Sequence, residues 1–324
     1  MRRSTEEGAG RRLGPRSAAG AGVMLITAAS VIFGAACASV NRTTVKENKA
    51  DASRYLAAGE YGKAIEAQKA LRRADPDNKR ILAGYLQTLE TIKKAADGAR
   101  GRAGYAEAAA GYGALFDGWD PDPALAAALS FGKKDVEEGK RACLIALTNE
   151  QATRMLDSGD RDGALAVWRK AIAVQPGEKA LRVPYAAAVV AIKTAADGAL
   201  AQQDQTAAGK SYALLRKYAG TFAGLEGLGK HRAELTAERL AVAVKACSRG
   251  LMDRGLAAYR KGELEKAIGI WRGALAFDPE NAEIGKAVET ATAQLGKVKK
   301  LDLGGQTPVD LGGQTPASQK YSTR

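Results

Sequence analysis

Three cysteines and a single histidine are the residues of this 324-residue chain with the widest choice of chemistry. Thiols can form disulfides, bind metals or act as nucleophiles. Cys143 lies sixteen residues before Gly159 and Cys247 lies fifteen before Gly262, so the two occupy nearly matching places in the sequence. If these places lie two packed helical hairpins apart, about 20 Å or more separates them, whereas a disulfide needs α-carbons within about 7 Å. We therefore expect small buried groups in helix seams, with an intermolecular bridge or a reactive thiol as alternatives.

Catalytic and metal-binding patterns are not found in the sequence. His231 is the only histidine, which excludes a histidine-rich metal site. No serine or cysteine has a base at a recognisable spacing, and there is no glycine-rich phosphate loop and no carboxylate pair in an apolar frame. We therefore predict a protein that is not an enzyme, with no catalytic residues, no metal site and no cofactor.

Cys37 differs from the other cysteines because it directly follows an apolar segment. Residues 1–16 contain five arginines and two glutamates, and residues 17–41 carry no charge. This order is typical of a secretory signal, and the small residues Gly34-Ala35-Ala36 before Cys37 resemble the lipobox of bacterial lipoproteins. The resemblance implies cleavage before Cys37, diacylglycerol on its thiol and usually acylation of the new amino terminus, which together give stable membrane attachment.

The resemblance to bacterial lipoproteins also implies a location in the cell. Ala38 stands where an aspartate often retains such lipoproteins in the inner membrane, so an outer-membrane anchor with the domain facing the periplasm is favoured. The alternative is an uncleaved inner-membrane signal anchor, because 25 apolar or uncharged residues can span a bilayer core of about 30 Å as a helix. We predict a signal peptide over residues 1–36 and a tether over residues 37–46.

The remaining elements are predicted from internal repeats. Three segments share a glycine, an alanine five residues later and a proline twelve residues after that: Gly59-Ala64-Pro76, Gly159-Ala164-Pro176 and Gly262-Ala267-Pro279. They resemble the tetratricopeptide repeat, a helix-turn-helix unit of about 34 residues. The glycine permits a left-handed turn after the first helix, the alanine permits close helix packing, and the proline ends the second helix.

A longer repeat relates the two halves of the chain. The segment beginning at Ile92 recurs at Ile192, and the same offset of 100 relates Tyr85 to Tyr185 and Tyr112 to Tyr212. We predict an all-α fold: an α-solenoid over residues 47–300 with about five hairpins and a C-terminal capping helix. The hairpins are expected at 45–76, 78–120, 134–176, 178–222 and 234–279, and the capping helix at 282–299 with Ile284, Val288, Ala291 and Leu295 on its packed face.

The C-terminal segment and the tryptophans support further expectations. Residues 301–324 contain Asp-Leu-Gly-Gly-Gln-Thr-Pro twice with few large apolar groups, which predicts disorder. Trp168 and Trp271 occupy matching places in second helices and are expected in the core. Trp119 is expected to be partly exposed.

A net charge of +13, from 49 basic and 36 acidic residues, favours anionic partners. No base-reading motif is present, and we expect no nucleic acid partner. By resemblance to tetratricopeptide arrays, first helices would line a concave groove for an envelope protein or peptide. The residues near groove-facing positions are Asn149, Thr153, Arg249, Met252, Leu256, Tyr259 and Arg260. The predicted function is a lipid-anchored envelope scaffold for protein-protein interaction, and the alternative is a spacer that binds cell wall or another anionic polymer.

Overall fold

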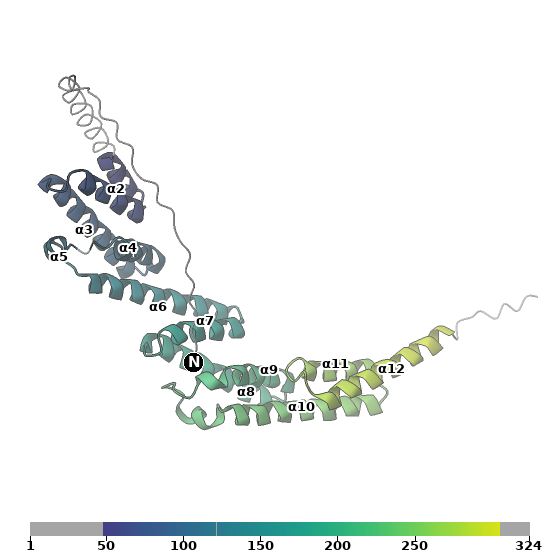
Figure 1. Ribbon diagram of the computed structural model, residues 1–324. Coiled ribbons are helices and arrows are strands. Elements are labelled where there is room, and N and C mark those ends of the chain that lie inside the picture. The colour runs from purple at the N-terminus through teal and green to yellow at the C-terminus, as the bar shows by residue number, and fades with distance from the viewer. Residues whose placement is uncertain (1–47, 121, 305–324) are drawn as a thin grey trace, which may run out of the picture. The chain divides into compact units, whose positions relative to one another are not determined.

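The computed structural model describes residues 48–120 and 122–304 of this chain. This part contains helices and no strand (Figure 1), which confirms the all-α prediction. Residues 48–57 are helical. The following elements are α2 (Tyr61–Ala74), α3 (Lys79–Gly101), α4 (Tyr105–Asp117), α5 (Pro123–Ala128), α6 (Lys133–Asp157), α7 (Arg161–Val174), α8 (Lys179–Ala201), α9 (Gln205–Tyr218), η1 (Ala219–Thr221), η2 (Gly229–Glu234), α10 (Ala237–Arg260), α11 (Leu264–Leu275) and α12 (Ala282–Gly304).

The predicted hairpins are all present, so the fold is an α-solenoid of five hairpins followed by α12 as the cap. Consecutive helices pack on one another, as α2 does on α3 and as each helix from α7 to α12 does on the next. The helices not predicted are short: α5 and the 3-10 turns η1 and η2, which lie in connections between hairpins. Helix α12 runs to Gly304, so residues 301–304 belong to a helix and not to the predicted disordered tail. The tail from 305 onward, like residues 1–47, lies outside the described residues.

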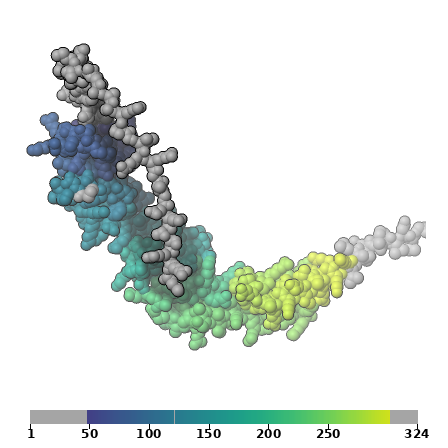
Figure 2. Space-filling model, viewed as in Figure 1, coloured from purple at the N-terminus to yellow at the C-terminus, as the bar shows by residue number. Residues whose placement is uncertain are grey.

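The described chain divides into two compact units, a division that the prediction of one domain over 47–300 did not include. The first unit holds α2, α3, α5 and most of α4, and the second begins at Lys140, inside α6, and continues through α12. Side chains fill the spaces between the helices of the second unit. Figure 2 draws this unit in teal through green to yellow.

The glycine turns form as the repeat pattern predicts. Gly59, Gly159 and Gly262 have φ of +74°, +87° and +79°, the left-handed region that only glycine adopts at little cost. After each glycine the next backbone N–H donates to the carbonyl five residues back, as from Asp160 to Met155 at 2.8 Å. This bond satisfies a carbonyl that the helix end would otherwise leave unpaired.

The predicted core residues are buried. Trp168 and Trp271 are each 1% exposed and Ala64, Ala164 and Ala267 are each 0% exposed, while Trp119 is partly exposed. Ile284 and Ala291 of α12 are buried, and Val288 and Leu295 pack on the same core. Helix α12 therefore covers the last apolar face of the second unit, as expected for a capping helix.

Helix α8 is the helix of the described chain that is long and apolar enough to cross a membrane by length and composition. It buries Leu181, Tyr185, Val189 and Ile192 against its neighbours, and it also contains Pro184. Its apolar character is explained by packing on two sides within the second unit, where α7 and α9 both contact it.

Candidate functional site

A pocket of about 570 Å³ lies where the sequence placed the groove of the last repeat. Three predicted residues of α10, Arg249, Met252 and Leu256, line this pocket. They share one face of the helix because their spacings of three and four residues bring side chains to the same side. The rest of the lining comes from α9, from α10, from the connection between α11 and α12, and from the start of α12: Arg216, Lys245, Ser248, Asp253, Asp278, Glu280, Asn281, Glu283 and Ile284. We call this the α10–α12 pocket.

The α10–α12 pocket has a fixed base. The Ser248 hydroxyl, in a side chain only 1% exposed, donates to Asp278 at 2.8 Å. The Asn281 amide donates to the same carboxylate oxygen at 3.0 Å, and its own oxygen accepts from the backbone N–H of Ile284. These bonds join the middle of α10 to the first turn of α12, so the pocket walls are held together without a ligand.

The cations of the pocket are available to a ligand. Arg216, Lys245 and Arg249 are exposed, and within the described part of the chain none has a carboxylate oxygen within 4.0 Å. Lys245 and Arg249 are one helical turn apart, an arrangement of like charges that costs a helix about 0.2–0.5 kcal/mol. Beside them Met252, Leu256 and the buried Ile284 supply an apolar floor.

The other predicted groove residues do not line this pocket. Tyr259 lines a second pocket of about 520 Å³ near Leu295 and Val298, where its hydroxyl donates to Gln294 and its ring packs 6.0 Å from that of Trp271. Arg260 is exposed at the end of α10. Thr153 is exposed on α6.

Asn149 is used inside the fold. Its side-chain oxygen accepts from Trp168 Nε1 at 2.8 Å, and its amide donates to the carbonyl of Ala180 at 3.0 Å. Both polar ends of the side chain are thereby occupied by α7 and α8. The predicted lipidation residue, Cys37, lies outside the described residues.

The two other cysteines are buried, as predicted for helix seams: Cys143 and Cys247 are each 0% exposed. Burial raises the pKa of the Cys247 thiol. A buried thiol with a raised pKa is a poor nucleophile.

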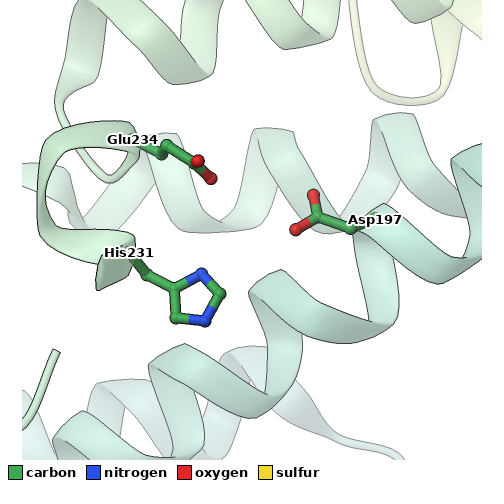
Figure 3. A group of neighbouring side chains, drawn as sticks. All are labelled: Asp197, His231 and Glu234. Atoms are coloured by element: carbon green, nitrogen blue, oxygen red, sulfur yellow. The ribbon is translucent and has the colours of Figure 1, made fainter. Parts of the chain in front are cut away.

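Three potential metal ligands meet in the second unit, which the sequence did not predict. Asp197 comes from α8, and His231 and Glu234 come from η2; their ligand atoms lie within 4.8 Å of one another. Figure 3 shows the two carboxylates directed toward the same space, with the imidazole beside it. No local spacing in the sequence could have indicated this meeting, because the packing of a loop on α8 creates it.

A lysine ammonium already occupies the position of the cation in this cluster. Lys193 Nζ donates to Asp197 at 2.7 Å and to Glu234 at 2.6 Å, and its side chain is only 8% exposed. The Tyr212 hydroxyl also donates to Asp197 at 2.7 Å. A metal ion would have to displace this ammonium, so the cluster fits a structural ion-pair network that holds η2 on α8 better than a metal site.

The first unit contains the counterpart of this network at an offset of 100 residues. Lys93 Nζ donates to Asp97 at 2.6 Å, and the Tyr112 hydroxyl donates to the same carboxylate. Phe131 stands where the second unit has His231, and the Lys93 ammonium lies 5.7 Å from the centre of its ring. In the first unit the Phe131 ring therefore covers Lys93, whereas in the second unit Glu234 pairs with the corresponding lysine, Lys193.

Replacing Asp197 with asparagine is expected to destabilise the second unit by about 1–3 kcal/mol, since it removes a charged hydrogen-bond acceptor from a nearly buried lysine. Burial disfavours the Asp197 carboxylate, but hydrogen bonds from Lys193 and Tyr212 outweigh burial and hold its pKa below the ordinary value. This stabilisation is therefore present above pH ~4, the ordinary range of an aspartate, and is lost as the pH falls through the lowered pKa.

Urea denaturation of the wild type and of Asp197→Asn between pH 3 and 7 measures this effect. The difference in stability should shrink at the acid end, and Asp97→Asn, the matched variant in the first unit, should behave alike. A difference that stays constant over the whole range would contradict the lowered pKa.

Comparisons with protein-family models, with curated proteins and with solved structures find no match for this chain. The likeness to the tetratricopeptide repeat therefore rests on the glycine, alanine and proline positions and on the hairpins they form.

Proposed function

We propose that this protein is a lipid-anchored scaffold of the bacterial envelope that binds a protein segment in the α10–α12 pocket. The observation that carries the proposal is the set of unpaired cations, Arg216, Lys245 and Arg249, beside the apolar floor of Met252 and Leu256. Cations that form no ion pair with the described residues stabilise an incoming carboxylate, and the floor stabilises an apolar side chain. The role is binding and not catalysis.

The segment must suit both signs of charge in the pocket. Asp253, Glu280 and Glu283 line it together with the three cations. A ligand with many negative charges would be repelled by these carboxylates. The best match is a segment with one carboxylate, one large aliphatic side chain and otherwise uncharged hydrogen-bond donors.

A photo-crosslinking residue in place of Met252 tests the proposal in living cells. Discrete crosslinked protein products are expected, and they should be lost when Lys245→Glu and Arg249→Glu are added together, because a reversed charge repels the carboxylate. The variant Lys286→Glu, an exposed lysine of α12 outside the pocket lining, is the control and should retain them. Crosslinks that persist unchanged in the double variant would refute the pocket assignment.

The alternative function, attachment to cell wall or another anionic polymer, is favoured by the net charge of +13. It predicts sedimentation with purified cell wall that weakens as the salt concentration rises. Salt-insensitive sedimentation, or none, would count against it.

The proposed anchor is tested by the intact mass of the membrane-extracted protein. A chain that begins at Cys37 and carries acyl mass is expected, and Cys37→Ala should abolish both the cleavage and the added mass. A full-length, unmodified wild-type chain would instead identify residues 17–41 as an uncleaved signal anchor.

A further inference from the structure

The chain itself contains a segment with the chemistry that the α10–α12 pocket requires. Residues 310–316 read Asp-Leu-Gly-Gly-Gln-Thr-Pro. They offer one carboxylate, one leucine and the uncharged donors of a glutamine and a threonine, and the next charged residue is Lys320. The carboxylate complements the three cations and the leucine complements the apolar floor, while the uncharged donors suit the pocket carboxylates Asp253, Glu280 and Glu283.

We propose that residues 310–316 of a second copy of this chain occupy the α10–α12 pocket. The inference deepens the proposed function and rests on it, since it identifies the class of segment that the pocket binds. Asp310 pairs with Lys245 and Arg249, and Leu311 packs on Met252, Leu256 and Ile284.

The reach of the chain explains why the segment comes from a second copy. The cations lie level with the start of α12, because Ser248, next to Arg249, is bonded to Asp278. Twenty residues of helix separate Ile284 from Gly304, about 30 Å at a rise of about 1.5 Å each. Six residues join Gly304 to Asp310, at most about 22 Å when fully extended. The α-carbon of Asp310 of the same chain thus stops about 8 Å short of this level even when residues 305–310 are fully extended. Long side chains would have to span that gap, and Leu311 would reach its own pocket only from a fully stretched tail.

The first copy of the motif is not an equivalent ligand. It begins at Asp302 and Leu303, and residues up to Gly304 belong to α12. A helical backbone presents neighbouring side chains about 100° apart, whereas an extended segment can lay its backbone and alternate side chains along a groove. No residue of the second copy belongs to α12, so we assign the second copy as the ligand.

The contact joins two different surfaces, so each copy offers one pocket and one tail. Such a head-to-tail contact either closes into a ring or grows into an open chain of copies. Because the two surfaces differ, a variant without the pocket and a variant without the tail should associate only with each other, which a symmetric dimer would not do.

A labelled peptide of residues 306–318 measures the contact directly. Its fluorescence anisotropy should rise when it binds the full-length, detergent-extracted protein that carries Asp310→Lys and Leu311→Ser, in which the competing tails are disabled. Binding should weaken at least tenfold when Arg249→Glu is added, while Lys286→Glu should leave it unchanged. A peptide with Asp310→Asn and Leu311→Ser should bind at least tenfold more weakly to the unaltered pocket.

Sedimentation of the extracted protein tests the head-to-tail arrangement. The wild type should associate as its concentration rises, and the pocket variant (Lys245→Glu with Arg249→Glu) and the tail variant (Asp310→Lys with Leu311→Ser) should each be monomeric. A mixture of the two should form a 1:1 dimer and nothing larger, because the tail variant supplies the only functional pocket and the pocket variant supplies the only functional tail. A wild type that stays monomeric at every concentration tested would overturn the inference.

The outcomes separate this inference from the proposed function. If the peptide does not bind but the crosslinks at Met252 persist and depend on Lys245 and Arg249, the pocket binds another protein and only the tail assignment is wrong. If both fail, the proposed function is wrong as well.

Discussion

Replacing Trp271 with alanine is expected to lower the free energy of unfolding of the second unit by about 3–5 kcal/mol, the usual cost of deleting a buried tryptophan. The side chain is 1% exposed and is among the largest that the fold buries completely. It packs against Tyr259, and its Nε1 donates to the carbonyl of Met252 at 3.2 Å. The same residue therefore fills the seam between α10 and α11 and supports the pocket wall.

Urea denaturation followed by circular dichroism measures the loss for Trp271→Ala. Trp168→Ala removes the residue at the corresponding place of the third hairpin, also 1% exposed, and should cost a similar amount. Trp119→Ala is the control, because this ring is partly exposed and has a smaller buried area to lose. Equal losses for Trp119 and Trp271 would mean that burial does not set the cost.

The hairpins could be predicted because the sequence repeats the glycines that form the turns and the prolines that follow the second helices. Gly159 and Gly262 take the left-handed turns, and helices α7 and α11 end shortly before Pro176 and Pro279. In the degenerate hairpins the same turns fall on Ala103 and Gln203, with φ of +61° and +60°. No glycine marks these two turns, so the sequence predicted the degenerate hairpins from the repeat at an offset of 100 residues without placing their turns.

The site was only partly predictable for a physical reason. Positions on one helix follow from helical spacing, so Arg249, Met252 and Leu256 were found. Arg216 and Asp278 reach the pocket from α9 and from the segment before α12, and their approach depends on how helices pack. The sequence places Asn149 at a position that faces the groove in tetratricopeptide arrays. In the fold, however, its side-chain amide is hydrogen-bonded to Trp168 Nε1 and to the carbonyl of Ala180.

The charge of the chain becomes informative only when it is placed on the fold. Many basic residues pair within the fold, as Lys266 does with Glu263 one helical turn away at 2.7 Å and as Lys217 of α9 does with Asp162 of α7 at 2.8 Å. Such exposed pairs are screened by solvent, add little to stability and carry no information on a partner. The cations of the α10–α12 pocket differ because the fold leaves them without a carboxylate and sets them beside apolar side chains.

Gly255 is expected to reverse the sign of its response to an alanine substitution when Trp271 is removed. A β-carbon at residue 255 would lie 2.1 Å from Trp271 Nε1 and 2.4 Å from its Cε2, far inside van der Waals contact. In the wild type Gly255→Ala should therefore cost about 1–3 kcal/mol through overpacking. In the Trp271→Ala background the clash is gone, and the same change should stabilise by up to about 1 kcal/mol, the helix preference of alanine over glycine.

A double-mutant cycle on the urea midpoints measures this coupling, which should be about 1–4 kcal/mol, the difference between those two effects. Gly269→Ala is the matched control: it lies on α11 with nothing within 4 Å of its added β-carbon, so it should stabilise both backgrounds alike. If Gly255→Ala and Trp271→Ala are instead additive, the two residues do not share the seam. The close approach of α10 to α11, on which the pocket wall depends, would then need another explanation.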